Sequence, residues 1–230
     1  MSTLILLRHG ESVWNRDARF SGWADVDLTS TGADQAREAG RRLRAAGIAP
    51  DVAYTSLLRR AIHTLELALA ALDRSRIPVH RDWRLNERHY GALEGESKSA
   101  TARRLGDAEF QHLRRGLRTR PPAIPHDDPR HPRHVGAYRE VAADALPAAE
   151  SLEDTLQRLL PYWDAAIAPS LAAGQTTLVC AHTHSLRALL YRLDGHTPES
   201  IEAVEIPTAT PLVYRLDAGL QPIERETMCA

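Results

Sequence analysis

The stretch TTLVCAHTHSLRALLYRL, residues 176–193, joins a short apolar run to an amphipathic one. Its first six residues predict a buried strand, and leucines spaced three to four apart from Leu186 onward predict a helix. His182 therefore falls directly after a strand, where the chain turns into a helix. Open α/β sheets bind their ligands at this carboxyl edge of the strands, so His182 is a candidate functional residue.

A second histidine holds the same kind of position near the N-terminus. The run TLILL at residues 3–7 has no polar alternation, which is typical of a strand buried on both faces. It ends at Arg8, His9 and Gly10. Because the carboxyl ends of parallel strands meet at one edge of a sheet, we expect His9 and His182 at the same edge.

Strands and helices alternate through most of the remaining chain. Ser30-Thr31-Gly32 offers N-cap chemistry for the first helix. The sequence predicts helices over about 32–46, 57–73 and 152–168, and strands at 51–55, 77–80 and 210–216. This alternation indicates an α/β fold, with a mostly parallel central sheet flanked by helices on both faces.

Residues 91–150 interrupt this alternation. They contain one predicted helix near 98–117, followed by RTRPPAIPHDDPRHPRHVG at 118–136, where closely spaced prolines exclude regular structure. We therefore expect a single domain over residues 1–230, with an irregular and partly helical insertion at about 91–150.

The composition is that of a soluble globular protein. The 230 residues are 43% hydrophobic, and their formal net charge of -1 gives no reason to expect nucleic acid or a membrane as partner. The N-terminal apolar run is too short for a signal peptide or a membrane span. Two cysteines, Cys180 and Cys229, indicate no disulfide framework. These observations favour a reducing compartment, and we expect a cytoplasmic protein.

Two arginines join the histidines at the strand ends. Arg8 precedes His9, and Arg60 lies where the helix after the second strand begins. Two guanidinium groups and two imidazoles around one hollow suit a tetrahedral phosphate dianion, because arginine is always charged and its donors match phosphate oxygens. A neutral imidazole nitrogen can also attack phosphorus while cations stabilise the transition state. A lone histidine at a strand end is more often structural, so the remaining motifs decide.

Six blocks of sequence resemble, in order and spacing, the cofactor-dependent phosphoglycerate mutases of the histidine phosphatase superfamily. They are LLRHGESVWN (6–15), RFSGWADVDL (19–28), YTSLLRRAIHT (54–64), WRLNERHYGAL (83–93), the pairs RR (114–115) and PP (121–122), and AHTHSLRALL (181–190). The resemblance covers nearly the whole chain. It implies one phosphoglycerate mutase-like domain, with the insertion at about 91–150 on the substrate side.

The resemblance implies catalytic roles for the strand-end residues. His9 matches the histidine that becomes phosphorylated, and Glu87 matches the carboxylate that takes and returns a proton. A carboxylate fits this role, because transfer to or from a hydroxyl moves a proton and a bound phosphate raises the carboxylate's pKa. A structural salt bridge to Arg84 or Arg88 is the alternative for Glu87. The residues that match the phosphate-holding shell are Arg8, Asn15, Arg60 and His182.

A second set of residues matches the family's substrate-binding positions. A small acid with three negative charges needs cationic groups at the end opposite the phosphate pocket. Lys98, the only lysine among 29 basic residues, matches one of these positions. A solvated helix lysine is the alternative for Lys98. The implied substrate-binding residues are Asn15, Ser21, Gly22, Arg60, Glu87, Tyr90, Lys98, Arg114, Arg115, Thr183 and His184.

The implied activity is that of an isomerase, which interconverts 3-phosphoglycerate and 2-phosphoglycerate in glycolysis and gluconeogenesis. Phosphorylated His9 donates to the substrate, and 2,3-bisphosphoglycerate serves as both intermediate and primer. The resemblance also implies a homodimer or homotetramer. Two alternatives stay open. One is a phosphomonoesterase of the histidine acid type, or a mutase for another small phosphate ester; the other is a non-catalytic protein that binds phosphometabolites.

The sequence departs from the family pattern directly after His182. Thr183 and His184 stand where the family has glycine and asparagine. Glycine lets the backbone approach a phosphate closely, whereas threonine adds a branched side chain there. Histidine keeps a hydrogen-bond donor but changes its reach, and it can titrate near neutral pH. These two positions bear on substrate choice.

We expect no metal site. His182 and His184 alternate across a strand exit, and three further histidines lie in the proline-rich segment, but neither set has the clustered ligands of a structural zinc site. The loop histidines are expected to be solvated. They are His126, His131 and His134.

Overall fold

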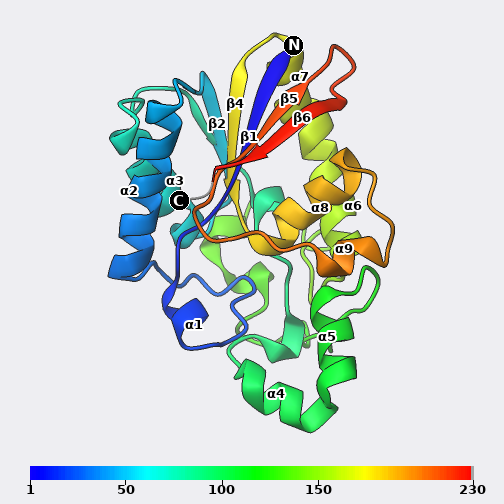
Figure 1. Cartoon of the computed structure of the whole chain (residues 1–230). Coiled ribbons are helices and arrows are strands. Elements are labelled where there is room, and N and C mark those ends of the chain that lie inside the picture. Colours follow the sequence, from blue (N-terminus) through cyan, green and yellow to red (C-terminus); the bar gives the residue numbers. More distant parts are fainter. Residues whose placement is uncertain (229–230) are drawn as a thin grey trace.

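The computed structural model describes residues 1–228 and has a six-stranded sheet at its centre (Figure 1). The strands are β1 (Ser2–Arg8), β2 (Val52–Thr55), β3 (Val79–Arg81), β4 (Thr176–Ala181), β5 (Leu212–Leu216) and β6 (Pro222–Thr227). Their order is β3-β2-β4-β1-β5-β6, in which the first four are parallel and the last two pair antiparallel. The predicted mostly parallel central sheet is confirmed.

The pairing of β1 with β4 brings the two strand-end histidines together. Arg8 lies opposite Ala181 in this parallel pair, and the His9 N–H donates to the Ala181 carbonyl oxygen at 3.0 Å. Because both strands end at this register, the rings of His9 and His182 have centroids 5.1 Å apart. The prediction that they share one edge of one sheet is confirmed.

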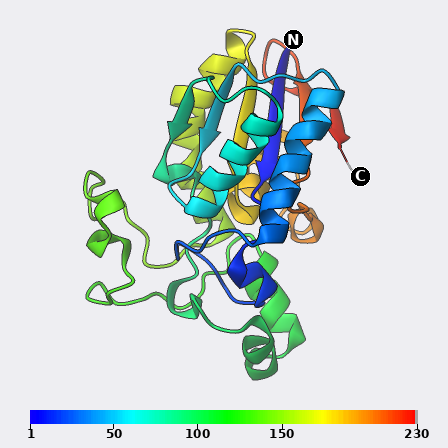
Figure 2. The same ribbon diagram turned by 90° about the vertical axis from the view of Figure 1, so that its left-hand side faces the viewer.

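Helices cover both faces of the sheet, as Figures 1 and 2 show. One face carries α2 (Ser30–Ala45) and α3 (Arg59–Ala71), and the other carries α6 (Leu152–Tyr162), α7 (Ala168–Ala172) and α8 (Thr183–Leu193). In β1, Ile5 and Leu7 pack with the first pair of helices, whereas Leu4 and Leu6 pack with the second group. Both faces of β1 are therefore buried, which explains why its sequence shows no polar alternation.

The predicted helices have different boundaries in the structure, and α3 is two residues shorter at each end than predicted. α2 begins at Ser30 because Thr29 is its N-cap, with Thr29 Oγ1 accepting from the Gly32 N–H at 3.0 Å. The predicted helix near 98–117 is two helices, α4 (Lys98–Leu105) and α5 (Asp107–Arg115), because Gly106 between them has φ of 81°. The predicted helix over 152–168 continues through a π-helical turn at Trp163–Ile167 and ends at Ala172.

Sequence reasoning missed β6. Its sequence is PIERET, it begins with a proline, and five of its six residues are exposed. An edge strand that faces water on both sides carries no apolar alternation, so hydrophobic periodicity cannot detect it.

Residues 91–150 lie beyond the carboxyl ends of the parallel strands, and Figure 2 shows part of them extending away from the sheet. Besides α4 and α5 they contain only three-residue turns in this part of the described chain, at Gly91–Leu93, Pro132–His134 and Gly136–Tyr138. His131 is fully buried between His126 and His134, so the expectation of solvated loop histidines is wrong for it. The short elements α1 (Val13–Arg16), α9 (Ser200–Ala203) and the turn Trp83–Leu85 lie near the same end of the sheet (Figure 1).

Within residues 1–228, no helix combines the length and apolar character that a membrane crossing requires. The Cys180 thiol is unpaired and buried, and burial raises its pKa. Cys229 lies outside the described residues.

The close approach of α2 and α3 predicts the effect of a single added methyl group. A Cβ at Gly40 would lie 2.2 Å from the Ala68 carbonyl oxygen. We expect Gly40→Ala to lower the free energy of unfolding by about 1–3 kcal/mol, because the two helices must separate, although alanine is favoured over glycine in a free helix by about 1 kcal/mol. Urea denaturation measures this. The control is Gly136→Ala, whose Cβ meets no atom within 4 Å; a stabilised Gly40→Ala would contradict the packing argument.

Candidate active site

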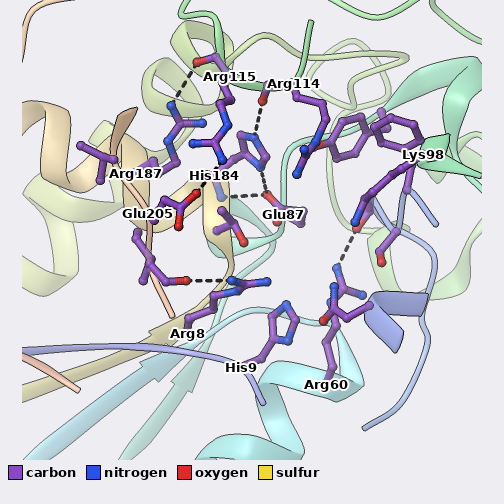
Figure 3. Close-up of a pocket in the computed structure, with 18 of the residues that line it drawn as sticks. Arg8, His9, Arg60, Glu87, Lys98, Arg114, Arg115, His184, Arg187 and Glu205 are labelled. Atoms are coloured by element: carbon purple, nitrogen blue, oxygen red, sulfur yellow. Dashed lines mark hydrogen bonds and ion pairs between the residues drawn. The ribbon is translucent and has the colours of Figure 1, made fainter. Parts of the chain in front are cut away.

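His9 lines a cavity of about 330 Å³ at the carboxyl edge of the sheet (Figure 3). Its Nδ1 lies 2.7 Å from the Gly10 carbonyl oxygen, and because a carbonyl only accepts, Nδ1 carries the proton and Nε2 carries the lone pair. Burial and the charges of Arg60 and Arg8 hold the pKa of His9 well below its usual range. Near neutral pH, His9 is therefore a neutral imidazole whose Nε2 can attack an electrophile.

Gly10 lets the loop after His9 run directly against the first turn of α2. A Cβ at Gly10 would lie 2.3 Å from the Gly32 carbonyl oxygen. The Gly10 N–H donates to Thr64 Oγ1 at 3.0 Å, which ties the same loop to α3. The His9 backbone is thus fixed by the sheet on one side and by two helices on the other.

His182 lies against His9 and is fully buried, and it is not among the residues that line the cavity. Its Nε2 is 2.8 Å from Ser56 Oγ, and its backbone N–H donates to Ser185 Oγ at 3.0 Å. Burial and the charge of Arg60 keep the pKa of His182 well below its usual range. This position makes it a neutral neighbour of His9.

Two arginines flank His9, of which Arg60 is fully buried and Arg8 partly buried. Arg60 donates to the carbonyl oxygens of Gly22 and Ala24 at 2.8 and 2.9 Å, and Arg8 donates to the Ile206 carbonyl oxygen at 2.7 Å. In both guanidinium groups Nε is buried and has no hydrogen-bond partner among the described residues. Burial lowers the pKa of each arginine, but both stay charged. An anion beside His9 would meet two cations that the backbone holds in place.

The cavity gathers nearly all of the residues that the sequence singles out. Residues from β1, α1, α3, α4, α5, α8 and the loops between them meet there, and Figure 3 shows ten of the lining side chains labelled. The predicted residues that line it are Arg8, His9, Asn15, Ser21, Gly22, Arg60, Glu87, Tyr90, Lys98, Arg114, Arg115, Thr183 and His184. His182 alone of the predicted residues contacts the cavity indirectly, through His9.

Six further residues line the cavity that sequence reasoning did not propose. Arg187 lies within the quoted motif AHTHSLRALL, and its position one helical turn after Thr183 was the available signal. Glu205 and its neighbours come from the segment before β5, and no sequence signal links that segment to the strand ends. The six are Phe20, Arg187, Val204, Glu205, Ile206 and Pro207.

Glu87 projects into the cavity from the loop after the turn Trp83–Leu85. Its Oε1 accepts from the Arg88 N–H at 2.8 Å, and from the His184 N–H and Nδ1 at 3.0 Å each. Burial alone would raise the pKa of Glu87, but the adjacent His184 and these donors outweigh it and hold the pKa well below its usual range. Glu87 is therefore an ionised carboxylate, and a bound phosphate would raise its pKa by like charge.

A buried ion pair holds the loop that carries Glu87. Arg158 from α6 donates from Nε and NH2 to the two carboxylate oxygens of Glu150, at 2.6 and 2.9 Å, and both side chains are at most 6% exposed. Its remaining donors reach carbonyl oxygens of the loop, from 2.6 Å at Arg84 to 3.3 Å at Glu87. The Trp23 indole N–H also donates to the Glu87 carbonyl oxygen, at 2.6 Å. The acid/base candidate therefore sits on a rigid backbone.

The wall opposite His9 is also basic. Lys98 begins α4, and Arg114 and Arg115 end α5. Burial lowers the pKa of Lys98 to about 8, and the charges of Arg114 and Arg8 add to this effect. Arg115 pairs with Glu205 at 2.7 Å, at the rim of the cavity. The cavity therefore presents cations at both ends.

No group of three or more His, Cys, Asp or Glu side chains within residues 1–228 could hold a metal ion. The cationic lining has the opposite charge to a metal site and matches an anion. Chemically, this arrangement can bind a phosphate ester at one end, bind a second anionic group at the other, and pass a phosphoryl group to or from His9 Nε2.

The sequence matches a protein-family model, described as histidine phosphatase superfamily (branch 1), over residues 4–226. A protein of Nitratidesulfovibrio vulgaris (strain DSM 19637 / Miyazaki F) is 51% identical over 223 residues, which span 97% of this chain and 90% of that protein. It is named 2,3-bisphosphoglycerate-dependent phosphoglycerate mutase.

Solved structures share the fold. A mycobacterial glucosyl-3-phosphoglycerate phosphatase, solved with VO3, matches with a TM-score of 0.72 at 21% identity, over 100% of this chain and 99% of that one. A phosphoglycerate mutase from Bacillus anthracis matches with a TM-score of 0.66 at 24% identity, over 93% and 88% of the two chains. At these identities the structures support the fold and not a particular activity.

The clamp on the Glu87 loop predicts a large effect on stability. Arg158→Met removes the partner of a buried carboxylate and leaves several carbonyl oxygens unpaired, so we expect the free energy of unfolding to fall by about 3–5 kcal/mol. Urea denaturation checks this. Arg37→Met is the matched control, because its ion pair with Asp34 is exposed, and it should change stability by less than about 0.5 kcal/mol. Equal effects of both substitutions would show that Arg158 does not act as a clamp.

Proposed function

The chain belongs to the histidine phosphatase superfamily (branch 1), and on this premise we propose that it is a 2,3-bisphosphoglycerate-dependent phosphoglycerate mutase, which interconverts 3-phosphoglycerate and 2-phosphoglycerate. The 51% identity to the named mutase across almost the whole chain supports this activity. The observation that carries the proposal at the site is a neutral His9, with Nε2 unprotonated, in a cavity that has cations at both ends.

In this proposal His9 transfers its phosphoryl group to the free hydroxyl of a bound monophosphoglycerate. The new O–P bond forms as the P–Nε2 bond breaks and its electron pair returns to the imidazole. Glu87 takes the proton of the attacking hydroxyl, while Arg8 and Arg60 balance the charge on the equatorial oxygens. In the return step His9 accepts the other phosphate of the bisphosphate, and Glu87 gives the proton back to the oxygen that leaves.

The second basic wall favours a mutase over a simple phosphatase. A mutase must retain a bisphosphorylated intermediate and let it turn over, so it needs anion-binding groups at the end away from the nucleophile. Lys98, Arg114 and Arg115 supply them. A phosphatase releases its product after one transfer and has less need for a second set of anion-binding groups.

The residues present fit 2,3-bisphosphoglycerate as primer and intermediate, because a cationic cavity of this kind matches a ligand with two phosphates and a carboxylate. The primer supplies the first phosphoryl group on His9. We place the activity in glycolysis and gluconeogenesis, and therefore in the cytoplasm. The single domain with its substrate-side insertion at about 91–150, and a homodimer or homotetramer, remain predictions from the sequence.

An assay with 3-phosphoglycerate, with and without a trace of 2,3-bisphosphoglycerate, tests the proposed function. We expect primer-dependent formation of 2-phosphoglycerate. His9→Ala should lower kcat by about 10³-fold or more and abolish acid-labile labelling of the protein by the bisphosphate, because the nucleophile is gone. His63→Ala is the control, since His63 is partly exposed and pairs with Asp27 outside the cavity.

Release of inorganic phosphate without 2-phosphoglycerate would sink the mutase in favour of a phosphomonoesterase. Binding of the phosphoglycerate with neither product would favour a non-catalytic protein that binds phosphometabolites. Labelling that persists in His9→Ala would move the nucleophile to another residue.

The lowered pKa of Lys98 predicts an alkaline limit to substrate capture. Lys98 is charged below its pKa of about 8 and neutral above it, so kcat/KM should fall as the pH rises through this value. Lys98→Arg keeps the charge at all accessible pH values and should remove this alkaline decrease of kcat/KM. The pH profile of kcat/KM checks the expectation, and Arg103→Lys, which adds a lysine on the exposed side of α4, is the control. If the alkaline decrease of kcat/KM is unchanged in Lys98→Arg, another group causes it.

A further inference from the structure

His184 is placed differently from a side chain that reaches for substrate. It is the second residue of α8 and is 6% exposed, and its ring lies edge-on to Tyr90 with centroids 5.7 Å apart. Its Nδ1 is 3.0 Å from Glu87 Oε1, and its Nε2 is 3.0 Å from the Arg114 carbonyl oxygen. Both ring nitrogens therefore face protein oxygens, as Figure 3 shows, although the ring itself borders the cavity.

The proton on this ring sits on the side of Glu87. Burial, together with the charge of Arg88, lowers the pKa of His184 to about 4. Its two neighbours are an ionised carboxylate and a neutral carbonyl. Because an ionised carboxylate only accepts hydrogen bonds, and its charge makes them stronger, Nδ1 carries a proton that points to Glu87.

The two carboxylate oxygens of Glu87 differ in the hydrogen bonds that they accept. Oε1 receives three N–H donors, from the Arg88 backbone, the His184 backbone and the His184 ring. No hydrogen bond among the described residues involves Oε2. An oxygen that already accepts three hydrogen bonds is a poor site for a further proton, so Oε2 is the atom left to exchange one.

We propose that His184 is a positioning residue for the acid/base step: it anchors Glu87 through Oε1 and leaves Oε2 as the atom that exchanges the proton with the substrate hydroxyl. The inference rests on the proposed function, whose reaction needs this proton transfer. During transfer from His9, the hydroxyl proton passes to Oε2 as the O–P bond forms. In the reverse transfer, Oε2 returns it to the oxygen that leaves phosphorus. His184 keeps its own proton throughout.

Charged and titratable groups surround this pair on every side, and they define the background against which the effect of His184 is measured. Arg88 is the nearest of them in sequence to Glu87, and Arg187 approaches from the next turn of α8. The groups that face the pair are Arg8, His9, Arg60, Arg88, Tyr90, Lys98, Arg114, His182 and Arg187.

Substitution of His184 by asparagine or by glutamine distinguishes the roles of the two ring nitrogens. Asparagine at position 184 can place its N–H donor near the site of Nδ1, toward Glu87, whereas glutamine places it near the site of Nε2, toward Arg114. We therefore expect His184→Asn to keep the pKa of Glu87 near its wild-type value. His184→Gln and His184→Ala should raise that pKa, because the donor to Oε1 is lost.

The experiment measures kcat, KM and the pH profile of kcat for the three variants, together with the 13C titration of the Glu87 carboxyl. In His184→Ala and His184→Gln we expect kcat to fall about 10- to 100-fold, because Glu87 is no longer held in place, with KM changed less than about 3-fold. The acid limb should move to higher pH, because a carboxylate with a raised pKa loses its base form earlier as the pH falls. His184→Asn should retain the wild-type limb, and His112→Asn on the exposed side of α5 is the control.

The outcomes separate the inference from the proposed function. A raised KM with an unmoved acid limb would mean that His184 contacts substrate directly, and identical behaviour of the asparagine and glutamine variants would remove the role of Nδ1. Either result overturns the inference. Since the carboxyl titration needs no turnover, a wild-type protein without mutase activity would defeat the proposed function while the shift in His184→Ala still upheld the anchoring of Glu87.

Discussion

Burial of like charges around one small cavity is the constraint on which the site depends. Two carboxylates, Glu87 and Glu205, face six cationic side chains within about 330 Å³ among the lining residues. Burial lowers the pKa of Lys98, Arg8, Arg60 and Arg187, because burying a charge costs free energy. A ligand with several negative charges offsets this cost. The six cations are Arg8, Arg60, Lys98, Arg114, Arg115 and Arg187.

The fold holds three of these cations, Arg8, Arg60 and Arg187, with backbone carbonyl oxygens, whereas Arg115 pairs with the Glu205 carboxylate. Arg60 binds carbonyls of residues 22–24, Arg8 binds that of Ile206, and Arg187 binds those of Arg115 and Ile201. A carbonyl fixes a guanidinium without cancelling its charge, so the arginines are oriented and still available to an anion. The same bonds hold irregular segments that have no sheet partner. Substitution of one of these arginines therefore removes an anion contact and loosens a loop together.

The prediction from the sequence agrees with the structure for features that depend on local sequence or on hydrophobic periodicity. The apolar runs that end at Arg8 and at Ala181 predict buried parallel strands, and such strands must bring His9 and His182 to one edge. Two things could not be predicted in this way. Glu205 lies at the cavity in a segment that Arg115 and Arg8 bind, and His184 turns toward Glu87 because of packing that no spacing rule encodes. The motif located position 184 at the site, but only the structure shows which oxygen its ring faces.

The first turn of α8 connects the nucleophile to the acid/base group. Three consecutive residues face three ways: His182 lies behind His9, Thr183 borders the cavity, and His184 contacts Glu87. A helix N-terminus also carries unpaired N–H groups and a positive dipole, and here the His184 N–H donates to the Glu87 carboxylate. Because one rigid turn fixes both partners, their relative position is set by backbone geometry and not by flexible side chains. A change of the His184 side chain therefore acts on Glu87 and leaves the contact between His182 and His9 in place.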